Sequence, residues 1–150
     1  MNNIKLKLKT TGISLIELVM VISLVSILAI YAVPKLDIDI FRETGYFQQA
    51  SAAIRYAQKQ AIASGCQVNV SITASSCSLT WGSCGAATGA SISRPGSTST
   101  NFCSDSTPGS TAGLPVSFSF DRIGRPSSGQ TINLGSHTIN VEAETGYTHE

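Results

Sequence analysis

GISLIELVMVISLVSILAIYAV, residues 12–33, is an almost unbroken apolar run near the start of this 150-residue chain. The 21 residues from Ile13 to Val33 would form a helix about 30 Å long, which matches the hydrocarbon thickness of a bilayer. The run contains no Lys, Arg or Asp, and lysines at positions 5, 7 and 9 precede it, as expected of a cytoplasmic segment before a membrane helix. We therefore expect residues 13–36 to form a transmembrane helix.

Glu17 does not fit a plain membrane anchor. A carboxylate inside a membrane helix costs a few kcal/mol, so it usually has a function or a partner. Two other interpretations of the run are weaker. A cleaved secretory signal peptide has a shorter apolar region and a small-residue cleavage site, and residues 29–32 form a poor site of that kind. A buried core helix of this length is more than a small soluble domain usually accommodates.

The segment from Gly12 to Ile22, GISLIELVMVI, resembles the prepilin motif of type IV pilins and type II secretion pseudopilins. The resemblance implies that residues 1–12 are a leader, which a prepilin peptidase removes by cutting after Gly12. It also implies that the same enzyme methylates the new amino terminus at Ile13. Two positions depart from the family pattern, because Ile13 and Ser14 stand where the family prefers Phe and Thr.

The same resemblance assigns roles to two further residues and suggests partners. Glu17 becomes the fifth mature residue, the family's conserved acid and an assembly contact, and Pro34 falls where the family's helix bends. The implied partners are other pilins or pseudopilins, an inner-membrane assembly platform and the membrane itself. The implied location is the bacterial inner membrane, crossed once with the C-terminal domain in the periplasm, and then a pilus or pseudopilus.

Residues 37–150 are long enough for one small domain and too short for two. Although the whole chain carries a net charge of +1, this part has six basic and eight acidic residues, a net charge of −2. Such a balance provides no general attraction for the phosphates of nucleic acid. We therefore expect one periplasmic domain that does not bind nucleic acid.

The pattern of residues 37–64 is that of an amphipathic helix. Ile40, Phe47, Ile54 and Ala61 recur every seven residues, and Ser64-Gly65 supplies a stop. Apolar residues then alternate with polar ones, which predicts a sheet within residues 66–150. The expected strands are residues 67–72, 77–81, 116–120, 131–134 and 137–141.

These elements predict an α+β, pilin-like fold. Its long N-terminal helix, transmembrane in its first half, would pack on one C-terminal antiparallel sheet of about five strands. A loop of about thirty residues, 82–113, interrupts the sheet, and loops of that length are usually functional or flexible. Ile92 and Phe102 are its only sizeable apolar anchors.

Two short turn motifs carry a second resemblance. Residues 120–127, FDRIGRPS, and residues 144–147, ETGY, are similar to the C-terminal halves of H-type pseudopilins, FimT-like pilins and minor pilins of mannose-sensitive haemagglutinin (MSHA) pili. Some FimT-like pilins bind DNA through arginines that follow the last Thr-Gly. Here residues 147–150 read YTHE, so DNA binding is not carried over. Arg122 and Arg125 are interpreted as turn charges that could bond the Asp121 carboxylate.

The four cysteines, at positions 66, 77, 84 and 103, all lie on the expected periplasmic side, where disulfides persist. If the first hairpin turns near Ser75, Cys66 faces Cys84, which leaves Cys77 for Cys103. The other attractive arrangement joins Cys84 to Cys103 and Cys66 to Cys77, and the sequence leaves both open. A zinc site is disfavoured because the chain has no C-x2-C unit and only two histidines.

No motif indicates catalysis or a cofactor. The chain has no H-E-x-x-H, no phosphate-binding loop and no nucleophile elbow. Two function classes remain. The first is a structural subunit, a minor pilin or pseudopilin of a type IV pilus or a type II secretion pseudopilus that assembles through its apolar helix. The second is a ligand-binding tip, or adhesin, in which loop 82–113 contacts a surface, a secreted substrate or DNA.

Overall fold

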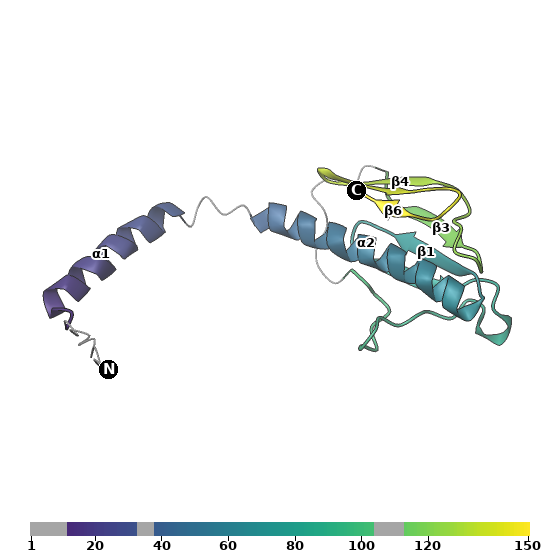
Figure 1. The fold of residues 1–150 in the computed structure, drawn as a ribbon, viewed down its shortest axis with the longest axis horizontal. Coiled ribbons are helices and arrows are strands. Elements are labelled where there is room, and N and C mark those ends of the chain that lie inside the picture. The colour runs from purple at the N-terminus through teal and green to yellow at the C-terminus, as the bar shows by residue number, and fades with distance from the viewer. Residues whose placement is uncertain (1–11, 33–37, 104–112) are drawn as a thin grey trace, which may run out of the picture. The chain divides into compact units, whose positions relative to one another are not determined.

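The computed structural model describes residues 12–32, 38–103 and 113–150. Contacts divide the chain into two units, residues 1–37 and residues 38–150. The described part of the first unit contains one helix, and the second unit contains the other long helix and the strands (Figure 1). Leader residues 1–11, Pro34 and loop residues 104–112, each part of a prediction above, lie outside the described residues.

Helix α1 runs from Leu15 to Ala32 and has 18 residues, three fewer than the predicted run of 21. At about 1.5 Å per residue it is about 27 Å long, shorter than the roughly 30 Å of hydrocarbon that it was predicted to cross. The described residues that precede it, 12–14, are not helical. Within the described part of the chain, no helix has both the length and the apolar character needed to cross a membrane.

Helix α2 spans Ile38–Ser64, 27 residues, and is amphipathic. Phe47, Ile54 and Ala61, three residues of the predicted apolar face, are buried. Ile40 was also assigned to that face but is exposed, because it lies in the first turn, ahead of the first buried residue of the helix. The helix ends at the predicted stop, where Gly65 adopts a φ of 66°.

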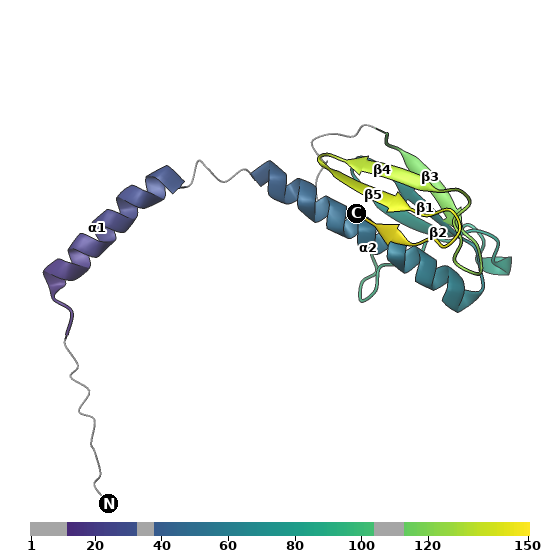
Figure 2. The same cartoon turned by 45° about the horizontal axis from the view of Figure 1, so that its top comes forward.

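The first sheet has the strand order β2-β1-β3, and both outer strands are antiparallel to β1 (Figure 2). Strand β1 is Val68–Ile72, β2 is Cys77–Trp81 and β3 is Val116–Phe120. Buried and half-buried residues alternate along β1, which is the period-two pattern that predicted the strand. Tyr46 of α2 ties the helix to the β1–β2 turn, since its hydroxyl donates to Thr73 O at 2.5 Å. Burial raises the pKa of Tyr46 to about 12.

The second sheet has the order β4-β5-β6 and is antiparallel throughout. Strand β4 is Gln130–Leu134, β5 is His137–Val141 and β6 is Thr148–His149. Strand β6 was not predicted, because two residues are too few to show an alternating pattern. The carboxylate of Glu43 on α2 accepts hydrogen bonds from the N–H and the hydroxyl of Ser136, in the tight β4–β5 turn.

The predicted fold class is therefore wrong. It placed all strands in one sheet on a long helix whose first half crosses a membrane. The described chain instead has two separate helices and two small antiparallel sheets, without an apolar membrane-spanning helix, so it is α+β only in part. Strand pairing explains the two sheets, because β4 and β6 both pair with β5, while β2 and β3 both pair with β1.

A single hydrophobic core lies between α2 and both sheets. Helix α2 contacts β1, β2 and β3 of the first sheet and β5 and β6 of the second. One cluster of buried side chains includes Phe47 and Ile54 from the helix, Phe120 from the first sheet and Ile132 and Ile139 from the second. The second unit thus has a hydrophobic core of its own, although a few large apolar residues, such as Phe41 and Ile123, stay exposed.

Candidate functional site

The predicted cleavage junction lies in an exposed, non-helical segment just before α1. Ile13 is 76% exposed, and the first helical hydrogen bond joins Leu18 N–H to Ser14 O at 3.1 Å. A Cβ atom added at Gly12 would meet no atom within 4 Å, and Gly12 has no left-handed φ. The described fold therefore does not require glycine at position 12.

Glu17 lies in the first turn of α1 and is exposed. A negative charge at this end of a helix is favourable, because the helix dipole is positive there. The carboxylate has no hydrogen bond or ion pair with any described residue. The structure thus gives Glu17 a compatible place in the helix but no partner among the described residues.

Helix α1 presents apolar side chains on all sides. The hydroxyls of Ser23 and Ser26 donate back to Met20 O and Ile22 O, so neither polar group needs an outside partner. The exposed large apolar residues fall at successive positions around the helix: Leu15, Ile16, Leu18, Val19, Met20, Val21, Ile22, Leu24, Val25, Ile27, Leu28 and Ile30. A helix that is apolar all round is normally buried by several neighbours.

The two turn motifs of the second resemblance meet at one side chain of α2. The amide of Gln58 donates to Gly124 O at 3.0 Å and to Thr145 O at 2.9 Å. A Cβ atom at Gly146 would collide with Gly124 O and lie 3.0 Å from a ring carbon of Phe120. These motifs therefore hold the two turns on the end of α2, a structural role that short turn signals in the sequence did not reveal.

The structure contains two disulfides and no free cysteine. Cys66 is bonded to Cys84 and Cys77 to Cys103, each with a Cα–Cα distance of 5.1 Å, which is the first of the two arrangements that the sequence left open. Among the described residues, no group of three His, Cys, Asp or Glu side chains is placed to hold a metal ion.

The described part of the long loop packs along the outer edge of β2. Ile92 N–H donates to Leu79 O at 2.8 Å and Phe102 N–H to Cys77 O at 2.8 Å. Both predicted anchors, Ile92 and Phe102, are buried. Residues 82–103 thus cover a strand edge that would otherwise offer unpaired backbone groups.

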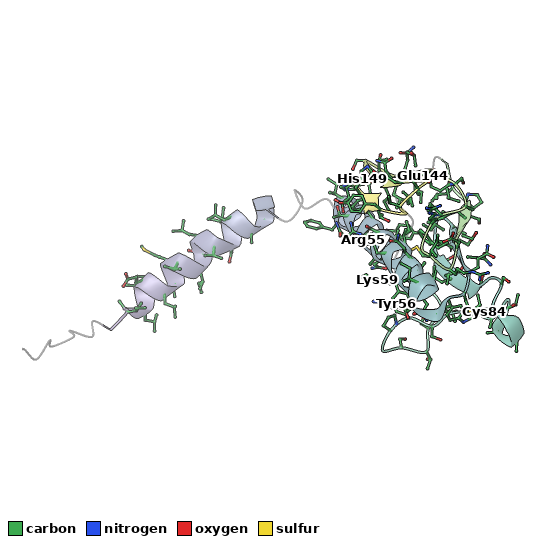
Figure 3. The ribbon with its side chains drawn as sticks, turned by 45° about the vertical axis from the view of Figure 1, so that its right-hand side comes forward. Arg55, Tyr56, Lys59, Cys84, Glu144 and His149 are labelled. Atoms are coloured by element: carbon green, nitrogen blue, oxygen red, sulfur yellow. A yellow bond between two sulfur atoms is a disulfide. The ribbon has the colours of Figure 1, made fainter. Side chains whose placement is uncertain are left out.

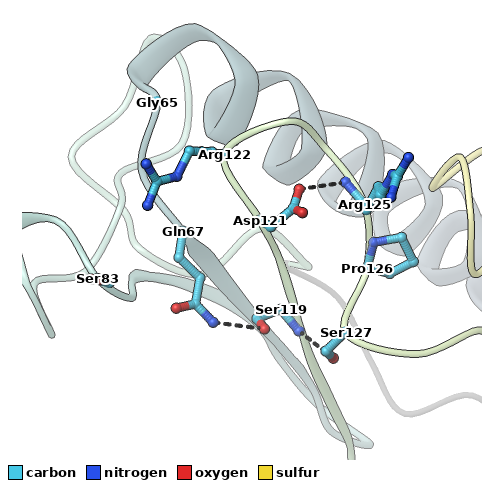
Figure 4. A pocket seen from close by; sticks show the side chains of 9 residues that line it. All are labelled: Gly65, Gln67, Ser83, Ser119, Asp121, Arg122, Arg125, Pro126 and Ser127. Carbon is cyan, nitrogen blue, oxygen red and sulfur yellow. Dashed lines mark hydrogen bonds between the residues drawn. The ribbon is translucent and has the colours of Figure 1, made fainter.

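A polar pocket of about 320 Å³ lies where β3 ends. Its walls come from the α2–β1 connection, Ser83 at the start of the long loop after β2, the end of β3 and the β3–β4 turn (Figure 4). The lining residues are Gly65, Gln67, Ser83, Ser119, Asp121, Arg122, Arg125, Pro126 and Ser127.

The hydrogen bonds around this pocket differ from the predicted ones. Oδ1 of Asp121 accepts from the backbone N–H groups of Ile123, at 3.0 Å, and Arg125, at 2.8 Å. The carboxylate therefore shapes the turn through backbone groups, whereas the guanidinium groups of Arg122 and Arg125 make no hydrogen bond or ion pair with any described residue. Both arginine side chains are exposed.

Two shallower cavities lie along the outer side of α2 and share Ala52 and Tyr56. Arg55, Tyr56 and Lys59 project from this side of the helix (Figure 3). Arg55 donates to Thr148 O at 3.3 Å, and the Tyr56 ring lies 5.5 Å from the ring of Phe102. These contacts join α2 to strand β6 and to the long loop.

No family model, curated protein or solved structure matches this chain.

Sequence reasoning missed most residues of the polar pocket. Gln67, Ser119 and Ser127 are ordinary polar residues at strand ends, and their spacing matches no binding motif. They come together only because β1 and β3 pair and the β3–β4 turn folds back, with Asp121 N–H donating to Arg125 O at 2.8 Å. The one usable signal was a pair of arginines in a turn, Arg122 and Arg125, which were interpreted as turn charges that could bond Asp121.

Proposed function

We propose that this chain is a minor structural subunit, a pilin or pseudopilin, of a type IV pilus or a type II secretion pseudopilus, and that it assembles through helix α1. The observation that carries the proposal is the surface of α1, which is apolar on all sides and bears a single carboxylate, Glu17. An exposed junction, Gly12–Ile13, stands directly before it.

The apolar surface of α1 calls for several neighbours. Removing apolar surface from water is worth about 25 cal/mol per Å². Helix α2 has one apolar face, and it buries that face against the two sheets. Helix α1 is apolar all round, so neighbours on one side alone cannot cover it. The core of a filament, in which each α1 is surrounded by the α1 helices of other subunits, supplies cover on every side.

Glu17 needs a cation in such a core. An unpaired buried carboxylate costs several kcal/mol, and residues 12–32 contain no Lys, Arg or His. Cleavage after Gly12 would create a charged amino terminus on Ile13, only four residues from Glu17. The amino terminus of a neighbouring subunit is therefore the partner we propose, with a prepilin peptidase and an assembly platform as the accessory partners.

The cysteines agree with this assignment. Two disulfides and no free thiol are typical of proteins in an oxidising compartment such as the bacterial periplasm. The second unit would lie in that compartment before and after assembly.

A ligand-binding tip remains the second candidate. Its case rested on loop 82–113, and the described part of that loop is fixed on β2 with its two apolar anchors buried. Packing of this kind favours a structural role for residues 82–103, so we rank the tip function below the filament subunit.

The test is a competition between Glu17→Val and wild-type subunits expressed together. The variant should be cleaved and should fold normally, yet its ratio to wild type in sheared or affinity-purified assemblies should fall at least about tenfold below its ratio in whole cells, as expected for one lost buried charge pair. A ratio near one would refute the assembly role of Glu17.

Ser23→Val is the matched control, because it makes a similar polar-to-Val change in the same helix. The Ser23 hydroxyl is satisfied by Met20 O, so this variant should enter assemblies as wild type does. Equal exclusion of both variants would show that assembly responds to any change in α1 and would remove the specific role of Glu17.

A further inference from the structure

The polar pocket at the end of β3 is large enough for a small ligand. Its volume of about 320 Å³ is at the lower end of the about 300–1,000 Å³ typical of such sites. Asp121, Arg122 and Arg125 give the lining a formal charge of +1. The ring of Pro126 adds an apolar surface to a wall that is otherwise mostly polar.

Several polar atoms of the pocket keep unused hydrogen-bonding capacity. Gln67 Nε2 donates to Ser119 Oγ at 2.9 Å, and no described residue donates to the side-chain oxygen of Gln67, Oε1. Ser127 Oγ accepts from Ser119 N–H at 3.3 Å, which leaves its own proton free to be donated. Oδ2 of Asp121 likewise receives no hydrogen bond from the described residues.

The two arginines occupy different places. Arg122 extends toward Gly65 and Gln67, whereas the guanidinium of Arg125 points away from Arg122, on the opposite side of the turn (Figure 4). Arg122 therefore supplies the five planar N–H donors that face the pocket, a geometry suited to a carboxylate.

The walls are held in place before any ligand arrives. The Cys66–Cys84 disulfide joins the segments that carry Gln67 and Ser83, and Gly82 N–H donates to Gln67 O at 2.7 Å. A pre-organised site loses less conformational entropy on binding, which raises its affinity for a small ligand.

From this arrangement we propose that the pocket binds a small acidic saccharide, with its carboxylate on Arg122 and its hydroxyls on Ser119, Ser127, Gln67 and Asp121. Alternating donors and acceptors match a polyhydroxylated ring. The guanidinium of Arg122 can pair with one carboxylate of a monoanion, while the Asp121 carboxylate disfavours a dianion such as phosphate. This site is independent of assembly through α1.

The experiment measures binding to the full-length chain in detergent by titration calorimetry and ligand-observed NMR. The probes are D-glucuronate, D-galacturonate and N-acetylneuraminate, with D-glucose, D-galactose and inorganic phosphate for comparison. We expect at least one acidic sugar to bind and the neutral sugars and phosphate to bind at least about tenfold more weakly, as expected for one charge-assisted hydrogen-bond pair. Equal binding of phosphate, equal binding of the neutral sugars, or no binding of any acidic sugar would overturn the proposal.

Arg122→Gln and Arg125→Gln form a matched pair of variants. Both remove one positive charge from the same turn, and neither guanidinium bonds to a described residue, so both proteins should fold. Arg122→Gln should weaken the acidic sugar about tenfold or more, and Arg125→Gln by less than about threefold. Equal losses would show a general charge effect and would refute the assigned carboxylate position.

Discussion

Helices α1 and α2 place their apolar side chains in opposite surroundings. On α2, Phe47 and Ile54 are buried against two sheets, whereas on α1 the corresponding kinds of residue, such as Ile22 and Leu24, are more than half exposed. The second unit completes its own core, and the first has no core within the described residues. The difference teaches that α2 satisfies its apolar residues within its own unit, whereas the apolar residues of α1 have no cover among the described residues.

The largest expected effect concerns the junction before α1. Gly12→Leu should block cleavage completely and leave a precursor that retains residues 1–12, because the proposed peptidase needs a small residue beside the scissile bond. The fold itself should tolerate the change, since a Cβ atom at position 12 meets no described atom within 4 Å. Intact-mass spectrometry of the purified chain measures this. A mature variant chain that begins at Ile13 would contradict the prediction, and so would a wild-type chain that begins anywhere else.

The next effect compares the two helices directly. Ile54→Ala should lower the free energy of unfolding of the second unit by about 2–5 kcal/mol, the usual cost of an emptied core position. Ile22→Ala, the same chemical change on exposed α1, should leave it within about 0.5 kcal/mol. The single tryptophan, Trp81 in β2, reports this unfolding by fluorescence in denaturant.

Equal losses in these two variants would break the comparison, because they would show that α1 contributes to the stability of the second unit. A loss of unfolding free energy in Ile22→Ala but not in Ile54→Ala would show the opposite of the proposed difference between the two helices.

A smaller effect concerns the hydrogen bonds between Glu43 of α2 and Ser136 in the β4–β5 turn, which we call the clamp. Hydrogen bonds from the backbone N–H and then the hydroxyl of Ser136 hold the pKa of Glu43 below its usual 4.5. A lowered folded-state pKa means that the clamp stabilises the fold above pH 4.5 and that this contribution is lost as the pH falls through the lower value.

Glu43→Gln should therefore be less stable than wild type at neutral pH, and the difference should shrink as the pH drops below 4.5. Chemical unfolding monitored at several pH values measures the difference. Glu144→Gln, a change at an exposed carboxylate in the turn before β6, serves as the control and should lack this pH dependence. A gap between Glu43→Gln and wild type that stays constant down to pH 3 would exclude the clamp as its cause.

Local sequence patterns predicted the helices and strands well, but they did not predict how the strands pair into sheets. Alternation predicted strands β1 to β5 within a residue or two, and the Ser64-Gly65 stop predicted the end of α2. Neither pattern shows which strands pair. The expectation of one sheet failed because β4 pairs with β5 and with no strand of the first sheet.

The candidate sites likewise divide into residues that stand out in the sequence and residues that only the fold brings together. The exposed junction at Gly12 and the isolated carboxylate of Glu17 are visible in sequence because they break a long apolar pattern. Gln67, Ser119 and Arg122 break no pattern, and they become a pocket only when β1 and β3 pair and the β3–β4 turn folds back. The two cysteine arrangements were likewise separable only after the fold brought Cys66 to Cys84.

The central claim is that other subunits cover α1, and photo-crosslinking from Leu24 tests it most directly. Leu24 is 62% exposed in the described chain. A photoreactive amino acid in place of Leu24 should yield covalent adducts with other pilin-type subunits in assembled material, identified by mass spectrometry. The same substitution combined with Gly12→Leu should yield none, because the precursor would not assemble. Assembled material in which Leu24 forms no adduct with another subunit would contradict the account.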